Sequence, residues 1–94
     1  AGFIDIFRIH SHHLLPVTLK LTLRSATLLT EEYPLAEKEL KKVGDNEWFL
    51  QTSVCSFEGV GRFVAGLPNE VQVIGSEAFR DFLRGKFLQG LRNL

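Results

Sequence analysis

The sequence predicts an α+β domain with the element order β-α-β-β-α-β-α, in which four antiparallel strands form one layer and helices form the other. Three observations lead to this prediction. Residues 17–23 alternate apolar and polar side chains, which is typical of a strand that buries one face. Residues 48–83 read as strand, helix, strand and helix in succession. The 94 residues are 45% hydrophobic and include eight Phe, which is enough apolar material for one core.

The start of the chain indicates a piece of a longer protein. The sequence contains no Met, and Ala1-Gly2-Phe3 resembles the interior of a protein more than a beginning. Residues 1–15 show no clear period and are interpreted as a short helix or as a linker arm from an upstream domain. We therefore expect an arm at residues 1–15 and one regulatory domain at residues 16–94.

The first helix is expected directly after the strand at residues 17–23. Ser25 is the predicted N-cap, and Leu28 and Leu29 are expected to face inward. Pro34 ends this helix, because proline lacks a backbone donor and restricts the residue before it.

The next segment, residues 35–43, is ambiguous. Its Glu and Lys content favours a helix by propensity. It leads, however, into Gly44-Asp45-Asn46, a turn cluster that is typical of a hairpin, and then into an aromatic strand at residues 48–55. Lysines on an edge strand suppress unwanted pairing. We therefore predict an edge strand.

The second half of the chain completes the pattern. Residues 56–67 place apolar side chains at helical spacing, and Pro68-Asn69 ends that helix. A short strand at residues 70–74 is followed by a last helix that begins at Ser76. Together these elements predict a ferredoxin-like two-layer sandwich with a four-stranded antiparallel sheet and an extra C-terminal helix.

Composition narrows the classes of function. Eleven basic and eleven acidic residues give a formal charge of zero, whereas a nucleic-acid module normally carries a basic excess. The single cysteine, Cys55, excludes an internal disulfide and fits a reducing, cytoplasmic environment. No apolar run approaches the roughly 18 residues that a membrane helix needs, so we expect no membrane contact.

No catalytic or metal-binding constellation stands out. His10, His12 and His13 lack a Cys or carboxylate partner at ligand spacing, so we interpret them as part of a loop or arm. Cys55 has no neighbouring base and reads as a small apolar residue. We expect neither a metal nor a cofactor, and no enzymatic activity.

The Gly-rich stretch Gly59, Gly61 and Arg62 is a weak candidate for an anion site, because backbone N–H groups at a helix start can bind anions. It loosely resembles the phosphate loop of acylphosphatases. Gly61 and Arg62 are adjacent, however, where that family has an aromatic residue between them, and Glu58 adds negative charge. The favoured interpretation is close packing of the helix on the sheet.

Two surfaces are candidates for protein contact. Phe49 is expected on the sheet face opposite the helices, and its strand lacks the signature of RNA-recognition motifs, so a protein contact or plain solvent exposure is favoured. The last helix is expected to bury one stripe of apolar side chains, formed by Phe79, Phe82, Leu83, Phe87 and Leu91. It carries more apolar residues than this stripe requires, and such a surplus usually marks an interface. The candidate interface residues are Phe79, Phe82, Phe87, Leu88, Leu91 and Phe49.

A family resemblance covers residues 16–90. The run Gly44-Asp45-Asn46-Glu47-Trp48-Phe49-Leu50-Gln51-Thr52-Ser53-Val54 is followed by a helix ending Gly66-Leu67-Pro68, the strand Glu70-Val71-Gln72-Val73-Ile74 and a helix with Leu83-Arg84. This pattern resembles the C-terminal extension (WCX) domain of WYL-domain transcriptional regulators. Ser76 stands where that family often has proline. The sequence lacks the Trp-Tyr-Leu motif and any helix-turn-helix, so we transfer no ligand-binding residue.

The resemblance implies a bacterial regulator with an N-terminal winged helix-turn-helix and a middle WYL domain. We therefore expect a non-catalytic regulatory and dimerisation domain, a homodimer that contacts its own upstream domains and reaches DNA only through them. Effector binding elsewhere would change how two such domains pack. The alternative is a small-ligand-sensing ferredoxin-like domain that uses the loops near Arg24 and residues 59–62. An acylphosphatase-like enzyme that depends on Arg62 is the third interpretation.

Overall fold

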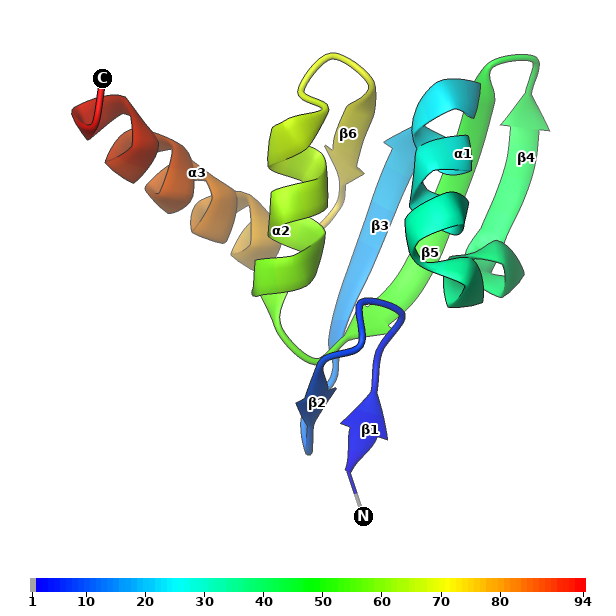
Figure 1. Cartoon of the computed structure of the whole chain (residues 1–94), viewed down its shortest axis with the longest axis horizontal. Helices are drawn as coiled ribbons and strands as arrows, with labels where there is room; N and C mark the ends of the chain where they lie inside the picture. Colours follow the sequence, from blue (N-terminus) through cyan, green and yellow to red (C-terminus); the bar gives the residue numbers. More distant parts are fainter. Residues whose placement is uncertain (1) are drawn as a thin grey trace.

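One layer of the fold is a four-stranded antiparallel sheet with the strand order β4-β5-β3-β6 (Figure 1). The computed structural model describes residues 2–94. In this order β5 separates β3 from β4, and β3 separates β5 from β6, as two interlocked β-α-β units require. The ferredoxin-like α+β prediction is confirmed. The strands are β3 (Leu15–Leu21), β4 (Leu40–Gly44), β5 (Glu47–Val54) and β6 (Val71–Ile74).

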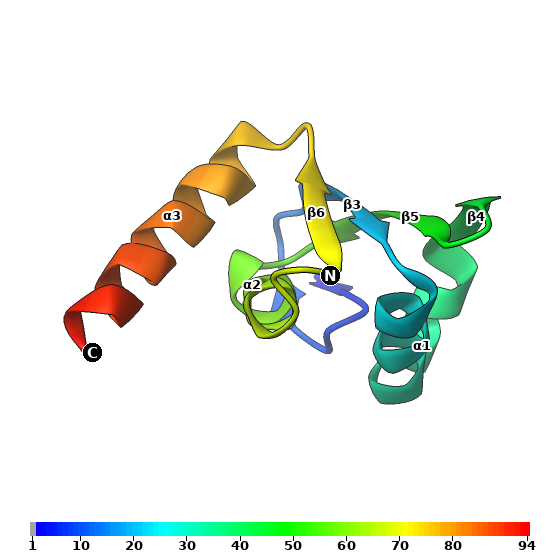
Figure 2. The same ribbon diagram turned by 90° about the horizontal axis from the view of Figure 1, so that it is seen from above.

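The second layer consists of helices on one side of the sheet. Figure 2 shows α1 (Leu23–Glu32) and α2 (Phe57–Gly66) below the strands, with α3 (Glu77–Arg92) beyond α2. The core lies between these layers. Its largest fully buried side chains include Phe79, Leu19, Leu21, Leu29 and Leu50. Across residues 2–94, none of the helices combines the length and the apolar character that crossing a bilayer would require.

A hydroxyl side chain caps each of the three helices. Ser56 Oγ accepts a hydrogen bond from the backbone N of Glu58 at 3.1 Å, and Ser76 Oγ accepts one from that of Phe79 at 3.3 Å. Such caps satisfy N–H groups that a helix cannot pair internally. The expected start of the last helix at Ser76 therefore holds, with Ser76 itself as the N-cap.

The predicted cap of α1 was wrong by one turn. Thr22 is the N-cap, and its Oγ1 accepts from the backbone N of Ser25 at 3.2 Å. Ser25 is fully buried and donates to the carbonyl of Thr22 at 3.0 Å. Ala26 and Leu29 face the core, as expected for Leu29, whereas Leu28, also expected inward, is 39% exposed.

The ambiguous segment divides into two elements. Pro34–Glu39 forms a 3₁₀ helix, η1, and the edge strand β4 begins only at Leu40. The edge-strand prediction is therefore confirmed for residues 40–43 and wrong for residues 35–39. Pro34 suits the first position of a helical turn. Ala36 is fully buried and its N–H bonds to the carbonyl of Tyr33 at 2.9 Å, which fixes this turn against the domain.

The N-terminal segment forms a small hairpin that packs on the domain. The strands β1 (Phe3–Ile4) and β2 (His10–Ser11) pair antiparallel. Between them, Ile6 and Phe7 are only 7% and 6% exposed and belong to the main core. The Phe7 ring contacts Tyr33 edge-on, with ring centroids 4.8 Å apart. Residues 3–11 are thus a hairpin and not the short helix that the sequence left open.

Candidate protein interface on the C-terminal helix

The first half of α3 is anchored in the domain. Phe79 is fully buried and Leu83 is 5% exposed. Phe57, at the start of α2, packs against two aromatic rings of α3, with ring-centroid distances of 5.1 Å to Phe79 and 5.6 Å to Phe82. The predicted inward stripe is correct for these three residues of α3. Phe79 is enclosed by its own domain and presents no surface to a partner.

The second half of α3 carries exposed apolar side chains. Figure 1 shows the helix diverging from α2 toward the C-terminus. Phe87, Leu88 and Leu91 are 46%, 59% and 63% exposed. Phe87 and Leu91 follow Phe79 and Leu83 at intervals of four, so the buried stripe continues along the same side of the helix into solvent. The expectation that Phe87 and Leu91 belong to the buried stripe was therefore wrong. We refer to Phe87, Leu88 and Leu91 as the distal stripe.

Basic residues surround the distal stripe. From residue 84 to residue 92, α3 contains Arg84, Lys86 and Arg92 and no acidic residue. Arg84 pairs with Asp81 at 3.0 Å, and Lys86 Nζ lies 3.5 Å from a carboxylate oxygen of Glu58 on α2. This half of α3 is thus both apolar and positively charged.

A groove separates α1 from α2 on the outer side of the helical layer. Its volume is about 480 Å³, and it is lined by Leu28, Glu31, Glu32, Arg62, Phe63, Gly66 and Leu67. Tyr33 lies at the end of α1, directly after Glu32. Burial, together with the Glu32 carboxylate, raises the pKa of Tyr33 above its ordinary value of 10.0, while Arg62 and Arg8 oppose the rise. We refer to the seven lining residues, Leu28, Glu31, Glu32, Arg62, Phe63, Gly66 and Leu67, as the α1–α2 groove.

Phe49 lies apart from the C-terminal helix. It projects from β5 on the sheet face that α1 and α2 leave uncovered, where it is half-buried. Its neighbours across the strands are Lys20 and Lys41. The aliphatic parts of such lysines commonly cover an aromatic ring. Phe49 and the distal stripe are therefore two separate surfaces.

The weak anion-site candidates lie inside α2. Gly59 and Gly61 are buried helical residues, and a Cβ atom added to them would lie 2.8 Å from Phe7 Cβ and 3.0 Å from Phe82 Cε1 respectively. These two glycines let the N-terminal hairpin and α3 approach α2 closely. Arg62 is exposed and lines the α1–α2 groove.

Residues 2–94 contain no group of three or more His, Cys, Asp or Glu side chains arranged to hold a metal. His10, His12 and His13 are exposed around β2. Cys55 is buried at the end of β5, where its Sγ lies 3.5 Å from the carbonyl oxygen of Phe3.

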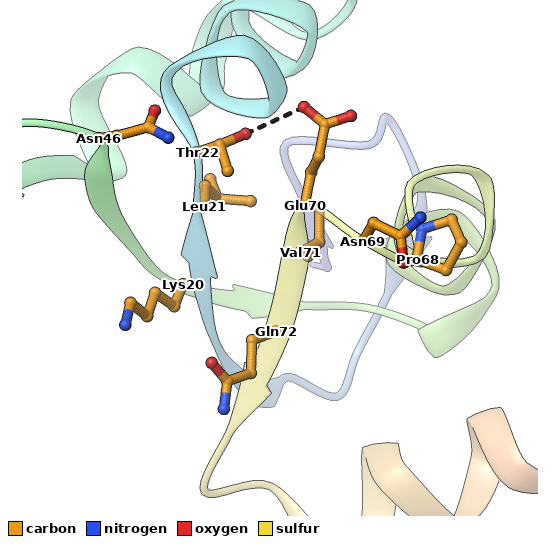
Figure 3. A pocket seen from close by; sticks show the side chains of 9 residues that line it. All are labelled: Lys20, Leu21, Thr22, Asn46, Pro68, Asn69, Glu70, Val71 and Gln72. Carbon is orange, nitrogen blue, oxygen red and sulfur yellow. Dashed lines mark hydrogen bonds between the residues drawn. The ribbon is translucent and has the colours of Figure 1, made fainter.

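A polar depression lies where β3 ends and β6 begins (Figure 3). Its volume is about 290 Å³. Glu70 lines it: one carboxylate oxygen accepts from Thr22 Oγ1 at 3.2 Å, and the other lies 3.0 Å from Arg24 Nη1. Arg24, near which the ligand-sensing alternative expected a loop, is the second residue of α1, and its side chain reaches Glu70 beside this depression. Figure 3 also shows the side chains of Lys20 and Gln72 extending from the strands at its rim.

Comparisons of the chain with models of known protein families, with curated proteins and with solved structures gave no match. Function is therefore inferred from the chain's own surfaces.

Sequence reasoning missed the α1–α2 groove and the role of Glu70. The groove depends on which side of α1 faces outward and on how α1 packs beside α2, and the sequence expectation placed Leu28 on the inner side. The exposure of Leu28 shows that this side of α1 faces the groove and not the core. The bond between Glu70 and Thr22 joins residues 48 positions apart, and no periodicity in the sequence signals it.

Proposed function

We propose that this chain is a non-catalytic regulatory and dimerisation domain of a bacterial, cytoplasmic WYL-type transcriptional regulator. It forms a homodimer, contacts its own upstream WYL and helix-turn-helix domains, and reaches DNA only through them. Effector state is relayed through the packing of two such domains, which sets the spacing of the DNA-binding domains. The distal stripe of α3 is the observation that carries this proposal.

Two features support the distal stripe as a subunit contact. Three large apolar side chains lie within residues 87–91, on the half of α3 that the domain leaves uncovered, and such patches on soluble proteins commonly mark interaction sites. The stripe is also continuous with the core through Leu83, so a partner seated on it extends the domain's own apolar packing. The resemblance to the WCX domain of WYL-type regulators supplies the biological setting.

The solution mass of the chain, measured by light scattering across a concentration series, tests the dimer. We expect the wild-type mass to approach twice the monomer mass as concentration rises. The double variant Phe87→Ser, Leu91→Ser should stay monomeric, because it replaces apolar contact area with polar groups. Its circular dichroism should match that of the wild type, since both side chains are already largely exposed.

Leu35→Ser is the matched control for this experiment. Leu35 is 56% exposed on η1, outside the distal stripe, so its replacement should leave dimerisation unchanged. A wild-type chain that remains monomeric at all concentrations, or a distal-stripe variant that dimerises normally, would contradict the proposed role.

The second candidate function is the sensing of a small polar ligand. The polar depression at Glu70 favours it, because Lys20, Thr22 and Asn46 lie around one recess together with Glu70. Thermal stabilisation of the chain by a small metabolite, lost in Lys20→Ala, would support this candidate over a purely structural role.

A further inference from the structure

We propose that the distal half of α3 from a second copy of this chain seats in the α1–α2 groove, and that the two copies exchange these contacts reciprocally. This inference rests on the proposed dimerisation function and names the surface on the partner that receives the distal stripe. Its support comes from apolar fit, from charge and from the placement of both surfaces in the fold.

The groove offers apolar contact between acidic and basic walls. Leu28 is 39% exposed, and Phe63 and Leu67 are half-buried, so all three present apolar surface to an incoming side chain. Glu31 and Glu32 form the wall on α1, both exposed. Among residues 2–94, neither carboxylate takes part in a salt bridge. The acidic wall is therefore available to a cationic partner.

The distal half of α3 has the complementary character. Phe87 and Leu91 supply the apolar stripe, and Arg84 and Arg92 flank it with positive charge. Within the described part of the chain Arg92 makes no salt bridge, and Arg84 has only an exposed partner one turn away, Asp81. Exposed pairs of that kind contribute little, so Arg84 can turn to a new carboxylate at small cost.

The placement of the two surfaces allows reciprocal exchange. The α1–α2 groove and the distal half of α3 lie on the same side of the sheet, with α2 between them (Figure 2). In the proposed dimer the two copies face each other with their helical layers about a two-fold axis, and each α3 lies over the other copy's groove. Such an interface is closed and self-complementary, which limits assembly to a dimer.

The chain cannot place its own α3 in its own groove. Phe79 and Leu83 fix the first half of α3 on the side of α2 that faces away from α1. From there the helix leads the C-terminus away from the rest of the molecule (Figure 1). An α3 that occupies this groove therefore belongs to another copy.

Charge reversal tests this exchange. One variant, Glu31→Lys with Glu32→Lys, makes the groove basic, and the other, Arg84→Glu with Arg92→Glu, makes α3 acidic. Each variant alone places like charges together in its homodimer, so its dissociation constant should rise by roughly tenfold or more. An equimolar mixture should dimerise about as well as the wild type, because the mixed dimer pairs opposite charges at both contacts. Sedimentation equilibrium measures all three constants.

The matched control is Glu37→Lys with Glu39→Lys. It changes the net charge by the same amount at two exposed residues of η1, outside the groove, and should leave the dissociation constant within about twofold of the wild-type value. Leu28→Ser supplies a test without a change in charge, and it should also weaken the dimer.

The outcomes separate this inference from the proposed function. If Phe87→Ser with Leu91→Ser abolishes the dimer while the basic-groove variant dimerises normally, α3 is the interface but the groove is not its partner, and the exchange is overturned. If the wild-type chain is monomeric at every concentration, both the exchange and the dimerisation function fail. Weakening of both charge variants with recovery in the mixture establishes the exchange.

Discussion

The carboxylate of Asp5 joins the N-terminal hairpin to the end of β5 through the backbone of Cys55. Asp5 Oδ2 accepts a hydrogen bond from the N–H of Cys55 at 2.8 Å, across 50 positions in the sequence. Its Oδ1 accepts from the N–H groups of Phe7 and Ile9 at 2.9 Å and 3.0 Å. Asp5 is only 4% exposed. One buried side chain thus fixes both the turn of the hairpin and its position on the sheet.

Asp5→Ala should destabilise the domain strongly. Three backbone N–H groups would lose a charged acceptor in a buried site, which costs about 3 kcal/mol or more of unfolding free energy. Urea unfolding followed by the fluorescence of Trp48, the only Trp in the chain, measures this loss. Asp5→Asn keeps one acceptor oxygen and should lose less, while Asp45→Ala, in the exposed β4–β5 turn, should have almost no effect. An Asp5→Ala variant as stable as Asp45→Ala would contradict the bridging role.

Gly59→Ala should also destabilise the domain, because the space for a side chain is already taken. A Cβ atom at this position would lie 2.8 Å from Phe7 Cβ and 3.1 Å from Ile9 Cδ1. Relief requires the N-terminal hairpin to shift, and overpacking of this kind typically costs about 1–3 kcal/mol. Urea unfolding measures the change.

Gly85→Ala, inside α3, is the control for this substitution. Nothing lies within 4 Å of a Cβ atom added at Gly85. Alanine favours a helix over glycine by roughly 1 kcal/mol, so this variant should be more stable than the wild type. Equal effects of the two substitutions would indicate that helix propensity alone, and not contact with Phe7, sets the role of Gly59.

The order of strands and helices was predictable because it depends on local signals. Alternation marks β3, and Pro34, Pro68 and the Gly44-Asp45-Asn46 turn separate the elements. These signals act over a few residues, so a single sequence displays them. The edge strand β4 was only partly predicted, since burial of Ala36 favours a 3₁₀ turn where propensity allowed strand or helix.

The features that the sequence did not predict depend on contacts between distant residues. Asp5 reads as one charged residue in an apolar arm, and its role appears only when Cys55 is brought beside it. The exposure of Phe87 and Leu91 depends on how α3 diverges from α2, because a helical stripe alone does not show how much of it a neighbour covers. The surplus of apolar residues on the last helix was visible in the sequence, but its restriction to the second half was not.

Phe79→Ala and Phe87→Ala should differ widely in stability, although both residues belong to one apolar stripe. Phe79 is fully buried, and truncating such a residue typically costs about 3–5 kcal/mol. Phe87 is 46% exposed, so its truncation should cost under about 1 kcal/mol in the monomer. Thermal unfolding at a concentration low enough to keep the chain monomeric measures both. Similar losses would show that the distal half of α3 packs on its own domain.

Tyr33 should ionise above its ordinary pKa of 10.0, because burial and the Glu32 carboxylate both disfavour the phenolate. The unfolded chain loses this proton near pH 10, while the folded chain holds it to higher pH. The stability that Tyr33 contributes is therefore fully present below about pH 10 and is lost as pH rises through the folded-state pKa. Tyr33 is the only Tyr in the sequence, so phenolate absorbance reports this one group.

Two substitutions should move the pKa of Tyr33 in opposite directions. Glu32→Gln removes a negative charge and should lower it toward 10.0. Arg8→Ala removes a guanidinium that lies 5.1 Å from the centroid of the Tyr33 ring and favours the phenolate, so the pKa should rise further. Glu31→Gln, one residue farther along α1, should change it less than Glu32→Gln does. A wild-type pKa at or below 10.0, or a shift in the same direction for both substitutions, would show that these charges do not control the phenol, because an acidic and a basic neighbour must act on it with opposite sign.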